Sequence, residues 1–223
     1  MIINEIFNLL LKTKVNMKSE HLGYWYLRLN GFFTFNNFIV HPESGMEQRT
    51  DIDILGVRFP FRAEIVDDPM IDDEPFNLET KRPYFAITEV KGNRCKLNGP
   101  WRNKEDQNMQ RVLRAVGMFN EDQIQIVADS LYSLGSFENE NYYVSLVCIG
   151  REANRDLKRE YPNVPQILFP AMLGFIYHRF KKYSEQKYSH PQWDNSGHFL
   201  WNECYHSTSK EEFVTKVLAA IVE

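Results

Sequence analysis

The feature that most constrains the fold is residues 142–150, YYVSLVCIG, a nearly continuous apolar run with the length of one β-strand. A run of this kind predicts a buried strand. Three more segments have the composition of strands, namely residues 32–40, 51–59 and 84–92 (FFTFNNFIV, DIDILGVRF and YFAITEVKG). The four segments together predict one central sheet.

Helical spacing of apolar residues and capping residues predict the elements around these strands. Capping-box patterns open helices at Asn120 and Ser209, and either Asn16 or Ser19 is expected to cap the second helix of the chain. Residues 184–208 are aromatic and rich in histidine, without clear periodicity. The expected helices are residues 2–13, 17–29, 103–118, 121–134 and 153–160, a helix near Pro170 entered through a strand or turn that begins at residue 166, and a terminal helix over residues 211–222.

The predicted order is two helices, three strands, one or two helices, a strand and three helices. This order is typical of an α/β or α+β protein with one mixed, four-stranded sheet flanked by helices. A chain of 223 residues is long enough to bury the core of one such domain. We assign residues 1–150 to this core and residues 151–223 to a C-terminal helical extension packed on it, within a single compact domain.

Neither a membrane span nor a signal peptide is expected. No apolar run approaches the roughly 20 residues that span a bilayer. The apolar stretch near the N-terminus has no basic region before it and no small-residue cleavage site after it, which favours an amphipathic helix. The cysteines at 95, 148 and 204 are widely spaced and predict free thiols in a cytoplasmic protein.

The net charge of −4 conceals an uneven distribution. Residues 64–79 contain seven acids and no base, whereas residues 91–114 contain seven bases and two acids. A second basic cluster lies within residues 179–187. The basic stretch is expected to meet phosphates while the acidic segment lies elsewhere. The alternative is that each charge run is a solvated face.

Charged residues stand at the ends of two predicted strands. Side chains alternate along a strand, so Asp51 and Asp53 share one face. For the same reason Glu89 and Lys91 share a face at the end of the next strand. If the two strands are neighbours, these residues meet at one edge of the sheet. Carboxylates placed there suit Mg²⁺, a hard cation that prefers oxygen ligands and can activate water beside a phosphate. The arrangement predicts phosphodiester hydrolysis, with a lysine that positions the attacking water.

The alternative at this position is a strand-end salt bridge between Asp53 and Lys91, with Glu89 in solvent. A Glu-x-Lys pattern is common by chance, and its location at the end of an apolar strand is what favours a site. Serine hydrolase and phosphate-loop chemistry are not supported, because neither Gly-x-Ser-x-Gly nor Gly-x-x-x-x-Gly-Lys occurs. Five residues invite a zinc interpretation, but their spacing fits no zinc-finger pattern: His178, His190, His198, Cys204 and His206.

The sequence Asp-Ile-Leu-Gly at residues 53–56, followed by Glu-Val-Lys at residues 89–91, resembles the PD-(D/E)XK nuclease superfamily. The resemblance covers roughly residues 17–150 and implies a restriction-endonuclease-like core with the order α–β–β–β–α–β. It implies that Asp53, Glu89 and Lys91 are catalytic, and that Asp53 and Glu89 bind Mg²⁺ or Mn²⁺. The literal Pro-Asp pair of the family is absent, because Ile52 precedes Asp53.

The resemblance also implies a surrounding set of residues. The family often adds an acid from the helix before the first strand, which makes Glu20 a candidate metal ligand, with Asp51 as an auxiliary or substitute ligand. Trp101 would stack on a base if it is exposed, and the alternative is that it packs in the core. The candidate nucleic-acid-binding residues are Arg94, Lys96, Trp101, Arg102, Lys104, Gln110 and Arg111.

We therefore expect a Mg²⁺-dependent deoxyribonuclease whose bases hold the phosphate backbone without reading its sequence. The choice of DNA over RNA, and a cytoplasmic role in bacterial or phage defence, follow from the resemblance alone. A second hypothesis is a catalytically idle scaffold subunit of a larger nucleic-acid-processing complex. A homodimer, or a protein partner bound through the acidic residues 64–79, is also considered.

Overall fold

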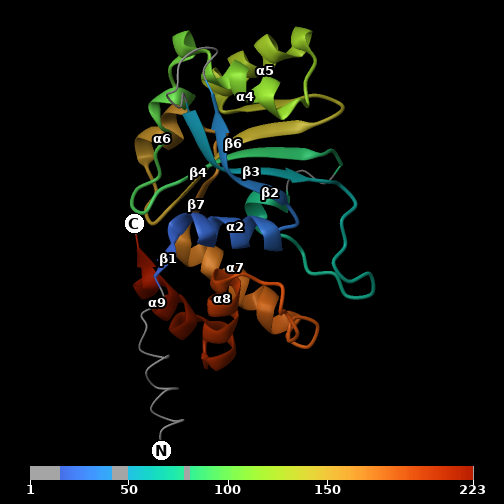
Figure 1. Ribbon diagram of the computed structural model, residues 1–223, viewed down its shortest axis with the longest axis vertical. Helices are drawn as coiled ribbons and strands as arrows, with labels where there is room; N and C mark the ends of the chain where they lie inside the picture. Colours follow the sequence, from blue (N-terminus) through green and yellow to red (C-terminus); the bar gives the residue numbers. More distant parts are fainter. Residues whose placement is uncertain (1–15, 42–49, 78–80, 223) are drawn as a thin grey trace, which may run out of the picture.

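The computed structural model describes residues 16–41, 50–77 and 81–222. The helix expected at residues 2–13 and the acid Glu79 lie outside the described residues. The described chain folds into a mixed α/β structure with helices on both faces of a sheet (Figure 1).

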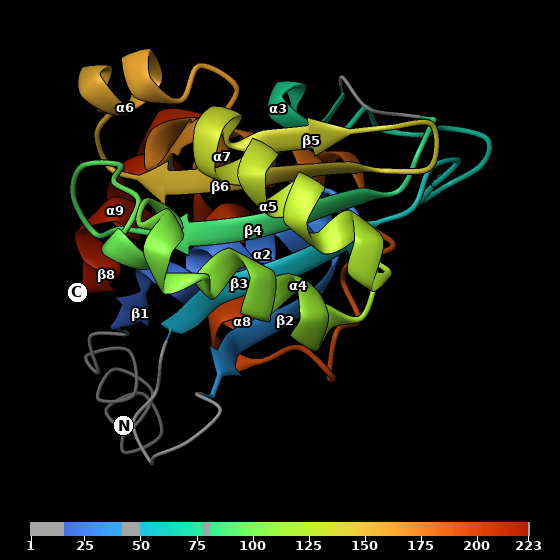
Figure 2. The same ribbon diagram turned by 90° about the horizontal axis from the view of Figure 1, so that it is seen from above.

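The sheet has six strands, in the order β2-β3-β4-β6-β5 with β7 also paired to β6 (Figure 2). Its β2–β3, β3–β4 and β5–β6 pairs are antiparallel, whereas β4–β6 and β6–β7 are parallel. The strands are β2 (Phe33–Val40), β3 (Thr50–Arg58), β4 (Tyr84–Val90), β5 (Ser136–Glu138), β6 (Tyr143–Gly150) and β7 (Gln166–Leu168).

The prediction of a four-stranded sheet is therefore wrong. The strands β5 and β7 have only three residues each, which is too short for a periodic pattern to develop. Both pair with β6, β5 near the beginning of that strand and β7 near its end. A further two-stranded parallel sheet joins β1 (Met17–Lys18) to β8 (Ile221–Val222), so both ends of the described chain meet there.

The helices largely agree with the sequence patterns. Asn120, Asn154 and Ser209 each accept a backbone N–H at the start of α5, α6 and α9, as expected of N-caps. Neither Asn16 nor Ser19 caps α2, because Lys18 occupies that position without a side-chain bond. The helices are α2 (Ser19–Leu29), α3 (Glu74–Asn77), α4 (Asn108–Val116), α5 (Glu121–Leu134), α6 (Arg155–Glu160), α7 (Phe169–Lys182), α8 (Asn195–His206) and α9 (Lys210–Ala220).

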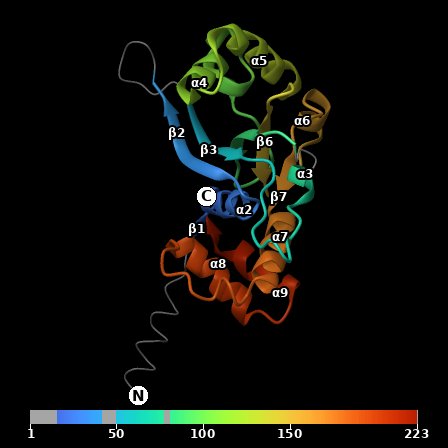
Figure 3. The same cartoon turned by 90° about the vertical axis from the view of Figure 1, so that its right-hand side faces the viewer.

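Two hydrophobic cores lie on the two faces of the sheet (Figures 1 and 3). The α2-side core joins the sheet to α2, and α7, α8 and α9 pack beyond that helix; its members include Trp25, Ile54, Phe169, Trp201 and Phe213. The α4-side core joins the sheet to α4 and α5; its members include Leu55, Phe85, Trp101, Leu113 and Leu131. All of β4 is buried between the two.

The helix α2 lies close against the sheet because of Gly23. A Cβ atom at this position would lie 3.0 Å from Ile54 Cδ1 and 3.2 Å from Val90 Cγ2, which is closer than ordinary van der Waals contact. One turn earlier on the same helix is Glu20. The close approach at Gly23 therefore holds the first half of α2 near Ile54 in the middle of β3 and Val90 at the end of β4.

The acidic residues 64–79 are largely engaged within the molecule. The guanidinium of Arg179 on α7 is fully buried and donates to Asp72 (2.9 Å) and Glu64 (3.2 Å). Arg58, at the end of β3, also pairs with Asp72 (2.5 Å). Lys182 pairs with the exposed Asp68 (2.6 Å). The acidic segment therefore does not lie apart from the basic residues as predicted, because it forms internal ion pairs with α7.

We expect Arg179→Met to lower the free energy of unfolding by about 2 to 4 kcal/mol, because it leaves the buried side chain of Asp72 with less compensating charge. The matched control on the same helix is Lys182→Met, whose exposed ion pair contributes at most about 1 kcal/mol. Urea denaturation at neutral pH measures both. Equal losses in the two variants would contradict a structural role for the buried network.

Candidate active site

The antiparallel register of β3 and β4 brings the two predicted acids together. The paired residues run from Arg58 opposite Tyr84 to Ile54 opposite Thr88. Asp53 and Glu89 are the next residues on their strands, immediately beyond the last pair. The first two members of the predicted site are therefore neighbours at one end of the sheet.

Asp53 is half-buried, and its Oδ2 atom accepts a hydrogen bond from the Val90 N–H (2.7 Å). Burial, together with the negative charges of Glu89 and Glu20, raises the pKa of this carboxyl from 3.8 to about 6. The Val90 hydrogen bond and the positive charge of Lys91 oppose this rise. The pKa of Asp53 therefore depends on the charges of three other members of the predicted site, Glu20, Glu89 and Lys91.

Glu89 is only 3% exposed, and both of its carboxylate oxygens have donors. The indole Nε1–H of Trp101 donates to Oε2 (2.7 Å), and the ammonium of Lys91 pairs with Oε1. The alternative of an Asp53–Lys91 salt bridge with a solvated Glu89 is thus wrong in both respects. Lys91 pairs with Glu89, and a buried carboxylate needs such partners because an isolated charge in the interior is costly.

The two auxiliary acids differ in their positions. Glu20 lies in the first turn of α2 and acts electrostatically on Asp53. Asp51 is exposed on β3, opposite Ile39 of the edge strand β2. The structure therefore groups Glu20 with the central residues, while Asp51 faces solvent two residues before Asp53.

Two predicted nucleic-acid-binding residues are buried. Trp101 is 1% exposed and Gln110 is 3% exposed, so neither can stack on a base or reach a phosphate, and the core alternative for Trp101 is confirmed. The sequence suggests only stacking or packing for Trp101. A donor role toward Glu89 leaves no recognisable pattern in the sequence.

The basic stretch is partly neutralised by internal contacts. Arg102 pairs with Glu160, and Lys104 pairs with Asp129, each at 2.7 Å. Arg111 donates to the carbonyl of Asp106. Arg94 and Lys96 are exposed in the segment that follows β4. These two bases, close in the chain to Lys91, are the members of the predicted set best placed to meet a phosphate.

No preformed metal cage is present in the part of the chain that the structure describes. Across residues 16–41, 50–77 and 81–222, no three His, Cys, Asp or Glu side chains gather closely enough to hold an ion by themselves. This finding covers the histidines of the rejected zinc interpretation as well. A cation at the candidate site would need ligands beyond the protein, such as water or a bound phosphate.

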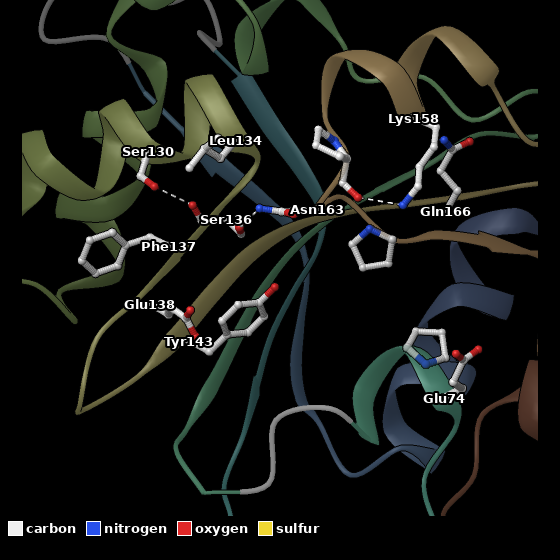
Figure 4. Close-up of a pocket in the computed structure, with 13 residues that line it drawn as sticks. Glu74, Ser130, Leu134, Ser136, Phe137, Glu138, Tyr143, Lys158, Asn163 and Gln166 are labelled. Carbon is white, nitrogen blue, oxygen red and sulfur yellow. Dashed lines mark hydrogen bonds between the residues drawn. The ribbon is translucent and has the colours of Figure 1, made fainter.

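A cavity lies on the β5 and β7 side of the sheet. It has a volume of about 730 Å³ and is lined by α3, α5, β5, α6 and adjoining segments (Figure 4). Its strand residues belong to β5, β6 and β7, whereas Glu89 belongs to β4, on the other side of β6. We place the candidate site at Asp53 and Glu89 because that is where carboxylates and a lysine converge.

Comparison with protein-family models, with curated proteins and with solved structures finds no match to the chain. Separately, none of the helices within the described residues is long and apolar enough to cross a membrane.

The raised pKa of Asp53 predicts a stabilising variant. The unfolded chain has the usual pKa of 3.8, whereas the folded state has a pKa of about 6. The folded state binds the proton more tightly, so the stability contributed by Asp53 falls as the pH rises from 3.8 to about 6 and stays low above it. In metal-free buffer, Asp53→Asn should match the wild type near pH 4 and exceed it by about 1 to 3 kcal/mol above pH 6. Urea denaturation across this range measures the difference, and an advantage that does not grow with pH would contradict the assignment.

The Trp101 hydrogen bond predicts a second change. Trp101→Phe keeps an aromatic ring and removes the donor to the buried Glu89, which should cost about 1 to 3 kcal/mol beyond the loss of ring volume. The control is Trp25→Phe, because Trp25 is equally buried but donates to the exposed Asp194 (2.9 Å). We expect a larger loss of unfolding free energy at position 101. A smaller loss there would show that the bond does not stabilise Glu89.

Proposed function

We propose that the chain is a metal-dependent nuclease that hydrolyses phosphodiester bonds of DNA, with Asp53, Glu89 and Lys91 as its catalytic residues. The observation that carries the proposal is the β3–β4 register, which places Asp53 beside Glu89 at one end of the sheet. The Lys91 ammonium lies against the same Glu89 carboxylate. Two acids and a lysine thus converge at the ends of neighbouring paired segments, an arrangement that suits metal-assisted phosphodiester hydrolysis.

The topology of the sheet supports a restriction-endonuclease-like core. The elements α2, β2, β3, β4, α4 and β6 follow the order α–β–β–β–α–β that the resemblance implies. In this interpretation the helix α5 and the short strands β5 and β7 are additions around that core. The C-terminal helices α7, α8 and α9 would then support α2 from behind.

The donor set fits a hard divalent cation. Asp53 and Glu89, assisted by Glu20 and with Asp51 as an outer candidate, would hold Mg²⁺ or Mn²⁺ through carboxylate oxygens. Their mutual repulsion, which helps to raise the pKa of Asp53, is what a cation among them would relieve. Mg²⁺ usually binds through one or two carboxylates and keeps several waters, so a cage of three protein ligands is unnecessary. When bound, the ion would supply Lewis-acid activation of water and of the phosphodiester.

The remaining roles fall to the protein itself. Lys91 would orient the attacking water and neutralise charge that develops on the phosphate. Trp101 would hold the Glu89 carboxylate in a fixed orientation when Lys91 turns toward substrate. Asp53, with a pKa of about 6, is mostly ionised at neutral pH and so available as a ligand. Arg94 and Lys96 would contact the phosphate backbone without reading sequence.

A catalytically idle scaffold is the alternative, and two observations favour it. Both oxygens of Glu89 already have donors within the chain, and the described residues contain no preformed metal cluster. The acids Glu64, Asp68 and Asp72 are engaged by α7, so a protein partner would find fewer of them available than the sequence implies. A homodimer, a preference for DNA over RNA and a cytoplasmic role in defence remain proposals drawn from the resemblance.

The deciding experiment is cleavage of supercoiled plasmid with Mg²⁺ or Mn²⁺. We expect wild-type cleavage to be abolished by chelator, and Lys91→Ala and Asp53→Asn to lower the rate by about 100-fold or more. Lys158→Ala, which changes an exposed residue of α6 that lines the cavity on the β5 and β7 side of the sheet, should retain wild-type activity.

A parallel assay with single-stranded DNA and RNA at matched salt separates the possible substrates, because phosphate contacts depend on salt concentration. If the folded wild type cleaves none of these substrates with either ion, the nuclease proposal fails and the scaffold leads. If Lys158→Ala loses as much activity as Lys91→Ala, the active site has been misplaced.

A further inference from the structure

The edge strand β2 contains a residue in an unusual backbone conformation. Asn37, in the middle of this strand, has φ of 52°. Only two other non-glycine residues within the described ranges have positive φ, Phe61 and Gln107, and both lie outside strands. A left-handed residue within a strand breaks the extended geometry that continuous pairing needs.

The pairing of β2 with β3 is interrupted at this residue. Pairs run from Phe33–Val57 to Asn36–Ile54 and resume at Phe38–Ile52. The register is the same on both sides, so neither strand contains an extra residue. The one pair missing from the ladder is Asn37 with Asp53, and Asp53 is the proposed catalytic aspartate.

The side chains change faces at the same place. Ile52 and Leu55 both belong to the α4-side core, while Ile54 between them belongs to the α2-side core. In a regular strand, residues three apart point to opposite faces. The two strands are affected together, because the rings of Phe35 and Phe38, also three apart, are in contact at 5.6 Å. The chain therefore turns at the Asn37–Asp53 position, and Asp53 lies where the alternation changes.

This turn has a direct consequence for Asp53. Its carboxylate does not follow the alternation of β3 but reaches the backbone N–H of Val90, at the end of β4. We infer that Asn37 is a positioning residue: its left-handed backbone opens the β2–β3 ladder and directs the Asp53 carboxylate toward Glu89. The effect of Asn37 on the position of Asp53 follows from the geometry alone, whereas its effect on catalysis rests on the proposed function.

The identity of the residue fits this role. Asparagine tolerates the left-handed region better than other residues with a Cβ atom, whereas β-branched residues there are strongly disfavoured. Strain of this kind persists where the surrounding structure imposes it and often accompanies a functional site. The side chain of Asn37 is exposed, so its replacement removes no core packing. Effects of substitution will therefore act mainly through the backbone.

The test compares Asn37→Thr with Asn37→Gly in the full chain. Threonine opposes the left-handed conformation and favours regular pairing, while glycine permits the native one. By NMR we expect the threonine variant to show the close contact of a regular antiparallel pair between residues 37 and 53, between their α-protons at a non-hydrogen-bonded position or between their amide protons at a hydrogen-bonded one. The wild type and the glycine variant should lack this contact. Asn37→Ala, with a milder backbone preference, provides an intermediate variant if threonine prevents folding.

The functional measurements are the Mg²⁺ dissociation constant by calorimetry and the kinetics of plasmid cleavage. We expect Asn37→Thr to lower kcat by roughly 10- to 100-fold, with little change in KM and with weaker Mg²⁺ binding, and Asn37→Gly to keep wild-type values. A general loss of structure would instead lower the melting temperature and affect both variants.

The outcomes separate the two proposals. If the wild type cleaves DNA and the threonine variant restores the ladder yet cleaves equally well, the positioning role is overturned while the nuclease stands. If the wild type cleaves nothing, the nuclease proposal fails, and NMR and Mg²⁺ binding still decide whether Asn37 controls the position of Asp53. Unchanged pairing in the threonine variant would overturn the structural inference itself.

Discussion

The burial of β4 on both faces is the constraint on which the rest of the structure depends. Every residue from Tyr84 to Val90 is buried, so the sheet must be covered by helices on each side. The α4 and α5 layer covers one face, and α2 covers the other with α7, α8 and α9 behind it. A charged residue at the end of such a strand is enclosed by the same layers. The position of Glu89 is therefore a consequence of how the core is built.

The features of this arrangement that lower the stability of the fold lie close together in the sheet. A buried carboxylate at Glu89 requires the Trp101 indole and the Lys91 ammonium. Burial and neighbouring charge make ionisation of Asp53 unfavourable, and the strand opposite it contains a left-handed asparagine. The buried carboxylate, the unfavourable ionisation and the left-handed residue each lower stability when considered alone. All three features occur at neighbouring positions, which packing alone does not require. Such clustering is expected at a functional site, where the surrounding structure maintains an unfavourable arrangement.

Much of the fold follows from the sequence because the signals are local. The apolar runs of β4 and β6 and the caps at Asn120 and Ser209 are confirmed. The strand β5 escaped prediction because three residues carry no periodicity, and β7 was expected only as a strand or turn before the helix near Pro170. The helix α8 lies in an aromatic segment whose pattern was unclear. The grouping of Asp53 with Glu89 was predicted only on the condition that β3 and β4 are neighbours. The Trp101 bond depends on how a loop returns to the strand, which no local pattern encodes.

The charge pattern of the sequence predicts the sign of each segment but not which charges pair in the fold. The acidic segment and the basic α7 were correctly seen as opposite in charge, but charges far apart in sequence can neutralise one another once folded. Arg179 and Asp72 are 107 positions apart and form a buried pair. Lys91, Arg94 and Lys96 follow β4 in the chain, and of these Lys91 pairs with the Glu89 carboxylate. Lys91 pairs with Glu89 and also lowers the pKa of Asp53. In the proposed nuclease, a divalent cation would add further positive charge among these acids.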